Sequence, residues 1–418
     1  MKSKNSRIYL DSEIGKLEEV IIHEPGREIE VITPVTAARL LYNDILPLGE
    51  VGKEYSILKA FLSTVAETVE VRDVLESVLA GDDARAEIIG SIAENSMLKN
   101  RENELYECSP SRLITILIEG LRNKINTLSS FLSENEFDYF PLPNLYFTRD
   151  SAMIFRDLII NGSMAHWVRK PEAVLMRQIF LRYYGMDNEK NIFDGTSVTD
   201  PGVTLEGGDF LVLNRQTILM GISERTTIDA VDILTDRLYE ALKEPLLIYC
   251  VILPVKRETI HLDMIFTVVN TDEAVIYEPY ITGEMQLKTV KISIDMKGEK
   301  NIRSVKNILS DLSGEQIILN PVLCGGNDKT LMQREQWLSG CNFFAFEPGK
   351  IIGYDCNEAT LRALEGAGYK IRNSADFISG RDNTENYDKL AVTVPGTELA
   401  RGGGGVRCMT LPVRRRRC

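Results

Sequence analysis

The stretch GDFLVLNRQTILMG, residues 208–221, decides the fold class of this chain. An apolar segment, a short polar turn and a second apolar segment are typical of a β-hairpin. Hairpins of the same form are predicted at RDSAMIFRDLIING (149–162), DMIFTVVNTDEAVIY (263–277) and CNFFAFEPGKIIGYD (341–355). A further strand is predicted near the N-terminus in KLEEVIIHEP (16–25).

Helical patterns lie between the hairpins, as in TTIDAVDILTDRLYEALKE (226–244) and EATLRALEGAGY (358–369). The hairpins begin about 55–80 residues apart, so a strand–strand–helix unit repeats along the chain. Such repetition favours an α/β fold built radially, as in a propeller with its helices outside. An α+β sandwich produces similar signals and stays open at this point.

Residues 72–138 differ from the rest of the chain because no hairpin interrupts them. Their apolar residues recur at helical spacing, and Ser109 and Pro110 form a plausible helix start. We therefore predict an all-helical insertion domain at 72–138, set into an α/β domain made of residues 1–71 and 139–418.

Composition excludes several classes of protein. The net charge of −13 argues against nucleic acid or an anionic membrane as a partner. No apolar run reaches the ~20 residues that span a bilayer, and no signal peptide is visible, so we expect a cytoplasmic protein. The seven cysteines include no CxxC pair, which predicts reduced thiols rather than disulfides or a zinc site. The basic run Arg414–Arg417 is interpreted as a solvated tail.

Acidic residues stand at the starts of the hairpin units. Asp150 lies in FTRDSA, Glu206 lies in LEGGDF, and Asp263 begins the third hairpin. In a radial fold these edges converge, so the three carboxylates are predicted to share one pocket. Carboxylates at such short distances from one another repel each other unless a cation lies between them. A divalent metal is one such cation, but a guanidinium group matches better, because it pairs with carboxylates bidentately.

The chain has three histidines, and His261 is the one with a suitable partner. At strand spacing, His261 and Asp263 point to the same side, so both are expected at the end of one strand. His23 and His166 are interpreted as structural. Cys408 follows the glycine run 402–405, which lets the backbone approach a substrate closely. A bound cation would help to keep this thiol ionised, which makes Cys408 a predicted nucleophile and His261 its acid–base partner.

These residues stand in motifs that resemble those of the bacterial arginine deiminases. The motifs are PNLYFTRD (143–150), EGGD (206–209), HLD (261–263), GGND with REQW (325–328 and 334–337) and GGVRCMTLPV (404–413). The resemblance extends from EEVIIHEPGREIEVITP (18–34) to Cys408. It implies a five-bladed α/β propeller, the pentein fold, with a helical insertion, and the α/β domain would then be the catalytic one.

The resemblance also implies the reaction and the roles of the residues. L-Arginine and water would give L-citrulline and ammonia through a covalent intermediate on Cys408, with His261 as general acid and base. Asp150 and Asp263 would hold the substrate guanidinium, and Glu206 would stand beside them. No metal or organic cofactor is implied, and a homo-oligomer, a dimer or a tetramer, is expected.

The amino-acid end of the substrate would be held by Asn144, Arg169 and Arg225. Many family members carry a further arginine in the final loop, where this chain has Gly403. Loss of that contact would cost about 1.5–3 kcal/mol of binding, which predicts a raised KM or weaker discrimination against decarboxylated analogues. Two alternatives therefore stay open: another guanidine-modifying enzyme (an agmatine deiminase or amidinotransferase), and a non-catalytic propeller that binds a partner.

Overall fold

All four predicted hairpins are present in the computed structural model, which describes residues 8–94, 98, 101–125, 127–132, 136–187 and 189–418. In each hairpin the two strands pair antiparallel across a short turn. The pairs are β5 (Ala152–Phe155) with β6 (Leu158–Asn161), β8 (Phe210–Asn214) with β9 (Thr217–Ile222), β11 (Phe266–Asn270) with β12 (Glu273–Ile276), and β16 (Phe344–Glu347) with β17 (Lys350–Tyr354).

A parallel strand extends each hairpin on the side of its second strand, after at least one helix. These strands are β7 (Asn191–Asp194), β10 (Leu246–Ile252), β15 (Asn320–Leu323) and β19 (Leu390–Val394). The intervening helices include α7 (Lys170–Gln178), α8 (Ile228–Leu242), α10 (Ile308–Gly314), α12 (Glu358–Gly366) and α13 (Ser374–Ile378). The predicted helices at 226–244 and 358–369 are thus confirmed as α8 and α12.

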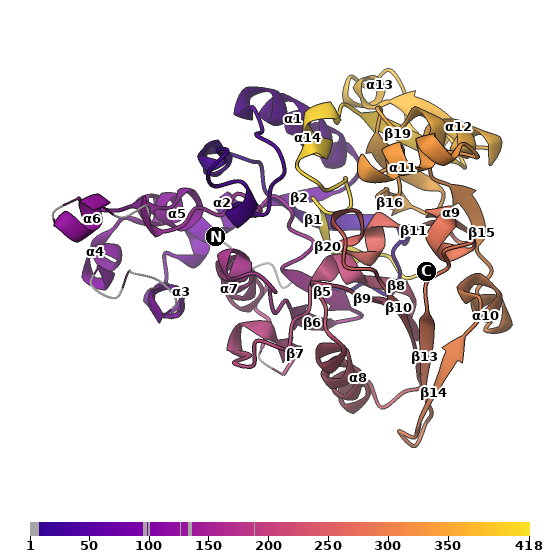
Figure 1. Cartoon of the computed structure of the whole chain (residues 1–418), viewed down its shortest axis with the longest axis horizontal. Helices are drawn as coiled ribbons and strands as arrows, with labels where there is room; N and C mark the ends of the chain where they lie inside the picture. The colour runs from indigo at the N-terminus through magenta and orange to yellow at the C-terminus, as the bar shows by residue number, and fades with distance from the viewer. Residues whose placement is uncertain (1–7, 95–97, 99–100, 126, 133–135, 188) are drawn as a thin grey trace.

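The two ends of the chain build one more sheet of the same kind. The predicted N-terminal strand is β1 (Leu17–Ile22), which pairs antiparallel with β20 (Leu411–Arg415) and parallel with β2 (Glu67–Glu70). The interpretation of Arg414–Arg417 as a solvated tail is therefore wrong for Arg414 and Arg415, which belong to β20, and Arg415 is buried. Helix α1 (Leu48–Val65) connects β1 to β2. The described residues thus contain five sheets of three or more strands, and Figure 1 shows the C-terminal β20 beside the N-terminal β1.

Three strands widen these sheets at their edges. The order β14–β13–β10–β9–β8 makes one sheet five-stranded, and β18 lies beside β19. The added strands are β13 (Thr289–Ile294), which lies between β10 and β14, and the edge strands β14 (Lys300–Val305) and β18 (Lys370–Asn373). Short helices and 3₁₀ turns complete this part of the fold: η1 (Arg27–Val31), η2 (Ala38–Leu40), η4 (Trp167–Arg169), η6 (Gly195–Ser197), η7 (Gly207–Asp209), η8 (Arg257–Thr259), η9 (Leu262–Met264), α9 (Glu278–Ile281), α11 (Lys329–Trp337), η10 (Thr384–Asn386) and α14 (Thr397–Arg401). The five-residue π-helix η5 (Ile179–Tyr183) continues α7.

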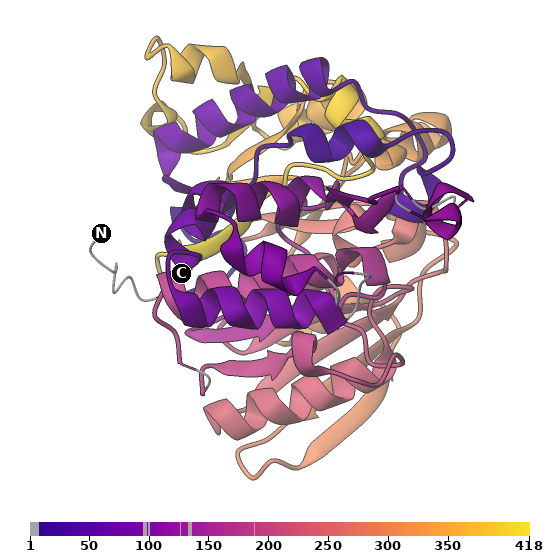
Figure 2. The same cartoon turned by 90° about the vertical axis from the view of Figure 1, so that its left-hand side faces the viewer.

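Helices dominate the segment predicted as an all-helical insertion, but it also contains a short β-ladder. The strands β3 (Leu121–Arg122) and β4 (Phe137–Tyr139) pair antiparallel there, and strands this short carry no alternating pattern. The helices are α2 (Val71–Val78), α3 (Asp82–Glu94), α4 (Glu102–Glu107), α5 (Pro110–Glu119) and α6 (Leu128–Leu132). Figure 2 shows this helical layer in front of the sheets.

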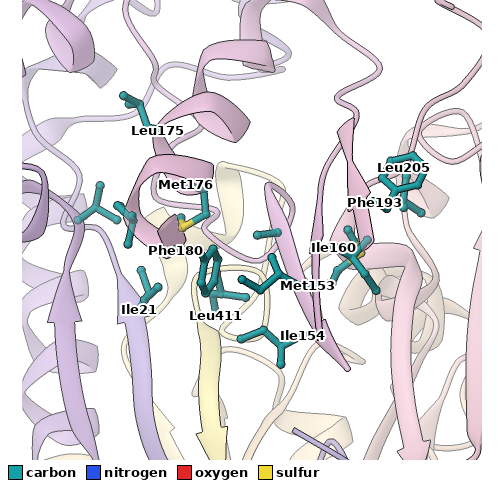
Figure 3. Close-up of a cluster of buried hydrophobic side chains, with 14 of the residues drawn as sticks. Ile21, Met153, Ile154, Ile160, Leu175, Met176, Phe180, Phe193, Leu205 and Leu411 are labelled. Atoms are coloured by element: carbon teal, nitrogen blue, oxygen red, sulfur yellow. The ribbon is translucent and has the colours of Figure 1, made fainter. Parts of the chain in front are cut away.

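The helical segment shares its hydrophobic core with the neighbouring sheets. One cluster joins Ile88 and Leu117 from the helices to Ile154 and Phe180. Figure 3 shows part of this cluster, where Phe180 and Met153 lie close to the strand residue Leu411. The division of the chain into two domains stays a prediction. None of the helices formed by the described residues has the length and apolarity needed to cross a bilayer.

Candidate functional site

Cys408 lies in the loop between α14 and β20, at the end of the glycine run. Its backbone N–H donates to Asn342 Oδ1 at 3.1 Å, and its carbonyl accepts from the Arg149 N–H at 3.1 Å. A side chain at Gly404 would collide with the Phe147 ring, because the nearest ring carbon would lie 2.4 Å from the added Cβ. The glycines therefore let this loop approach its neighbours closely and form part of a wall beside the thiol.

A cavity with an empty volume of about 370 Å³, including its open mouth, connects Cys408 to the other predicted site residues. Glycines 402–404 form part of its lining. The predicted residues that line it are Asn144, Asp150, Arg169, Arg225, His261 and Cys408.

His261 is buried at the edge of this cavity between two carboxylates. Its Nε2 lies 3.1 Å from Glu206 Oε2, and its Nδ1 lies 3.7 Å from Asp150 Oδ1. Burial alone would lower the pKa of His261, but Asp150 and the hydrogen bond with Glu206 outweigh it and raise the pKa to about 9. The ring is therefore an imidazolium near neutral pH, which can donate a proton.

The expectation that His261 and Asp263 lie on a strand is wrong. His261 precedes the 3₁₀ turn η9, which contains Asp263, and strand β11 begins only at Phe266. The buried Asp209 fixes this turn, because its Oδ1 accepts from the Leu262 N–H at 2.9 Å. The turn nevertheless brings both side chains close to the remaining site residues.

Asp263 lies against the thiol and against a buried arginine. Its Oδ2 is 3.8 Å from Cys408 Sγ and accepts from Arg407 Nη1 at 2.7 Å. Burial, followed by the charges of Asp263 and Asp150, raises the pKa of Cys408 well above its usual value. Without a bound cation the thiol is therefore protonated at neutral pH.

Arg169 occupies the centre of a buried cluster of carboxylates. It donates to Asp150 Oδ2 at 2.7 Å and to Glu172 at 2.8 Å, and it lies 3.6 Å from Glu206. All four side chains are almost completely buried. Asp150 therefore has one oxygen bound by Arg169, whereas its Oδ1 accepts no hydrogen bond from the described residues.

The other two residues predicted for the amino-acid end also reach the cavity. Arg225 donates to Glu206 at 3.4 Å and to Glu224 at 3.1 Å. Asn144 is buried, and its Nδ2 donates to the Leu40 carbonyl at 3.0 Å. The structure thus brings together all eight residues singled out by the sequence, six in the cavity lining and Glu206 and Asp263 directly behind it.

Asp150, Glu206 and His261 form the arrangement closest to a metal site. One ligand atom from each lies within 4.8 Å of the others. The guanidinium groups of Arg169 and Arg225 already supply positive charge to the same carboxylates. A divalent cation would have to enter beside them, so this donor set fits a site for hydrogen-bonding cations better than a metal site.

Several residues that shape the site had no predicted role. Asn342 donates to the Asp263 carbonyl in addition to accepting from Cys408, and Arg407 holds Asp263. Gln336, in the REQW motif, donates to the carbonyls of Glu258 and Met264 and so anchors the loop that carries His261. The sequence offered no signal for Asn342, whereas Arg407 and Gln336 lie inside motifs already quoted.

Asp328, in the GGND motif, has an ordinary structural role. Its carboxylate caps helix α11 by accepting from the N–H groups of Thr330 and Leu331, each at 2.9 Å. It does not belong to the cavity lining.

Comparison with known proteins places the whole chain in a single family. The arginine deiminase family matches residues 38–415. The arginine deiminase of Listeria monocytogenes serotype 4a (strain HCC23) is 31% identical over 426 residues, which cover 97% of each chain. That of Borrelia duttonii (strain Ly) is 32% identical over 426 residues, which cover 96% of each chain.

Solved structures share the α/β architecture of mixed sheets at much lower identity. SxtG, an amidinotransferase from Microseira wollei in the saxitoxin biosynthetic pathway, superposes with a TM-score of 0.54 at 13% identity and covers 99% of this chain and 98% of its own. The N-terminal domain of ArgZ, an arginine dihydrolase from cyanobacteria, gives 0.52 at 12% identity, with 95% and 97% coverage. At this identity the likeness concerns the fold alone.

Proposed function

This chain belongs to the arginine deiminase family, and we propose from its site that it hydrolyses L-arginine to L-citrulline and ammonia. One observation carries the proposal. Asp150 Oδ1 and Asp263 Oδ1 are buried and accept no hydrogen bond from the described residues. Asp150 lines the cavity with Cys408, and the other oxygen of Asp263, Oδ2, lies 3.8 Å from Cys408 Sγ. Buried carboxylate oxygens require donors, and a guanidinium supplies several in one plane.

The first half of the reaction forms a covalent intermediate. The Cys408 thiolate attacks the guanidinium carbon, the bond from that carbon to a terminal nitrogen breaks, and the leaving nitrogen takes a proton from His261 to depart as ammonia. The remaining amidino group is held on sulfur as a thioether. The raised pKa of His261, about 9, supports its role as the acid in this step.

The second half releases the product. His261, now neutral, removes a proton from a water molecule, and the resulting hydroxide attacks the same carbon. The carbon–sulfur bond then breaks and the proton on the added oxygen is lost to solvent, so that citrulline leaves as a neutral urea with the thiolate restored. Glu206, hydrogen-bonded to His261, stabilises the imidazolium in both halves.

Substrate charge accounts for how a thiol with a raised pKa becomes a nucleophile. The negative charges of Asp263 and Asp150 disfavour the Cys408 thiolate in the empty site. A guanidinium between these carboxylates cancels that repulsion and adds an attractive charge of its own. The enzyme would thus ionise its nucleophile only when a substrate is present.

The amino-acid end is proposed to contact Asn144, Arg169 and Arg225, as the resemblance implies. Their place in the cavity lining supports this assignment. We further propose that the five sheets are blades of a propeller, with residues 72–138 as a separate domain, and that the enzyme works in the cytoplasm as a dimer or tetramer. The recurrence of an antiparallel pair extended by a parallel strand in each of the five larger sheets supports the propeller.

Citrulline formation by the purified protein tests the proposal directly. Cys408→Ala is expected to reduce turnover by about four orders of magnitude or more, whereas Cys356→Ala, which changes a cysteine outside the cavity lining, is expected to retain it. Acid quenching of the wild type should trap a protein adduct with the mass of arginine less ammonia. Normal turnover by Cys408→Ala would refute the assigned nucleophile, and preferred turnover of agmatine, or amidino transfer to glycine, would refute the assigned reaction.

A further inference from the structure

The three arginines that line the cavity differ in how their charges are balanced. Arg169 has three carboxylates within ion-pair distance, and Arg225 has two. Arg257 lines the same cavity, but no carboxylate of the described residues lies within ion-pair distance of it, and no hydrogen bond to it is present among them. Its charge is therefore the one that the protein leaves available to an anion.

The surroundings of Arg257 also favour an anion. The charged and titratable groups that act on it are Arg225, Tyr42, Glu224 and Tyr146. Burial, followed by repulsion from Arg225, lowers the pKa of Arg257. An anion bound between two facing guanidinium groups relieves that repulsion and accepts their N–H donors.

The backbone at Gly403 leaves space for the Arg257 side chain. Gly403 has a φ of +88°, a conformation that favours glycine, and a Cβ at this position would lie 3.0 Å from Arg257 Nη2. The guanidinium thus lies over the part of the final loop that has no side chain. The missing side chain at Gly403 therefore leaves room for the Arg257 guanidinium, because any side chain at position 403 would displace this guanidinium.

The loop that carries Arg257 is held firmly. Arg257 begins the 3₁₀ turn η8, where Thr259 Oγ1 donates to the Pro254 carbonyl at 2.8 Å. Gln336 fastens the same loop through the Glu258 carbonyl. The anchored backbone fixes the position from which the Arg257 side chain reaches the cavity.

We propose that Arg257 binds the α-carboxylate of the substrate and supplies the contact that Gly403 cannot provide. This inference rests on the proposed function, because it takes the ligand to be an amino acid with a guanidinium group. It makes Arg257 a residue that determines specificity: it favours L-arginine over analogues whose carboxylate is missing or neutral. The cationic end is held at Asp150 and Asp263, so Arg257 affects binding rather than the chemical step.

The test compares L-arginine with L-argininamide, in which the carboxylate is replaced by a neutral amide. Binding of both is measured by calorimetry on a Cys408→Ala background, where no turnover occurs. Arg257→Gln is expected to weaken L-arginine binding roughly 10- to 100-fold and to change argininamide binding less than about 3-fold. Arg257→Lys, which keeps the charge, should recover part of the loss.

Lys256→Ala is the matched control, because it removes a neighbouring positive charge that does not line the cavity. It should leave the binding of both ligands unchanged. With Cys408 intact, Arg257→Gln should raise KM for L-arginine by the same factor while kcat changes little. Thermal unfolding of each variant checks that the fold is retained.

Four results would overturn the inference. Three are unchanged L-arginine binding in Arg257→Gln, equal weakening of both ligands, and a loss confined to kcat; the fourth concerns the Cys408→Ala protein itself. Failure of the proposed function is seen separately, as absence of citrulline from the wild-type protein. If the Cys408→Ala protein binds argininamide as tightly as L-arginine, no carboxylate site exists and the inference fails regardless of turnover.

Discussion

His23 and His261 have closely similar electrostatic surroundings in two different regions of the molecule. His23 is buried at the end of β1, where Nε2 lies 3.2 Å from Glu28 and Nδ1 lies 3.1 Å from Glu70. Burial would lower the pKa of His23, but the hydrogen bonds with Glu28 and Glu70 outweigh it and raise the pKa to about 9. The pKa of His261 is raised to the same value by the same kind of pair.

The two rings differ in what remains open to a ligand. Both nitrogens of His23 lie within hydrogen-bond distance of carboxylates, so the ring is fully satisfied. Among the described residues, His261 has a hydrogen-bond partner at Nε2 alone, while Nδ1 lies 3.7 Å from Asp150 and the ring lines the cavity that also contains Cys408. A raised pKa alone therefore does not mark a functional histidine; an incompletely bonded nitrogen beside a nucleophile does.

The largest expected effect distinguishes the two histidines by activity. His261→Asn should lower kcat by about 10²- to 10⁴-fold, because it removes the proton donor for the leaving ammonia. His23→Asn is the matched control and should keep kcat within a few-fold of the wild type. Steady-state citrulline formation measures both. Comparable losses in the two variants would show that the distinction drawn from hydrogen bonding is false.

The second-largest expected effect distinguishes His23 from His261 by the stability of the folded protein. His23→Asn leaves the buried carboxylate of Glu28 and the largely buried one of Glu70 without their shared cation, and should lower the free energy of unfolding by about 3 kcal/mol. The loss is moderated because Arg72 lies 3.6 Å from Glu28 and Lys59 lies 3.7 Å from Glu70.

Urea unfolding measures this change, with Lys53→Ala, an exposed helix residue, as the control for a surface ion pair. A destabilisation no larger than that of Lys53→Ala would mean that His23 is not the main cation for these two carboxylates.

Much of the fold was predictable because a hairpin forms between residues that are close together in the sequence. The turn at Arg215 and Gln216 and the apolar runs beside it lie within one short stretch, so β8 and β9 follow from residues close in sequence. The ladder of β3 and β4 was not predictable, because two- and three-residue strands are too short for a period to be read. The 3₁₀ turn at His261 depends on Asp209, a residue distant in sequence whose contact no local pattern encodes.

The identities of the site residues were predictable, whereas their pairing was not. Motifs singled out Asp150, Arg169 and Arg225, and all three reach the cavity. Arg169 binds Asp150 and Glu172, whereas Arg257 has no such partner in the part of the chain that the structure describes, and both facts depend on the packing of separate units. Charge balance within a buried cluster is a tertiary property, so the sequence indicated which groups meet but not which of them remain free for a substrate.

The smallest expected effect is a pH dependence to which both histidines contribute. Their folded-state pKa values are about 9 and their ordinary value is 6.5, so the folded protein holds more protons between these values. The contribution of the two histidines to the stability of the folded protein is complete below about pH 6.5 and is lost as the pH rises through about 9. Other buried acids with raised pKa values titrate lower, Glu172 at about 7 and Asp209 at about 6. Burial also raises the pKa of the Cys250 and Cys408 thiols above their ordinary value of 9.0, and this contributes as the pH approaches that value. The two histidines therefore dominate the slope between about pH 7 and pH 8.

The free energy of unfolding should therefore fall between pH ~7 and pH ~9, by on the order of 1–2 kcal/mol for each histidine. His23→Asn should remove about half of this slope, and His23→Asn combined with His261→Asn should remove most of it. Urea unfolding at several pH values within the range measures the slope. If the slope of the double variant equals that of the wild type, neither ring is held as an imidazolium, and the protonated His261 that donates to ammonia loses its physical basis.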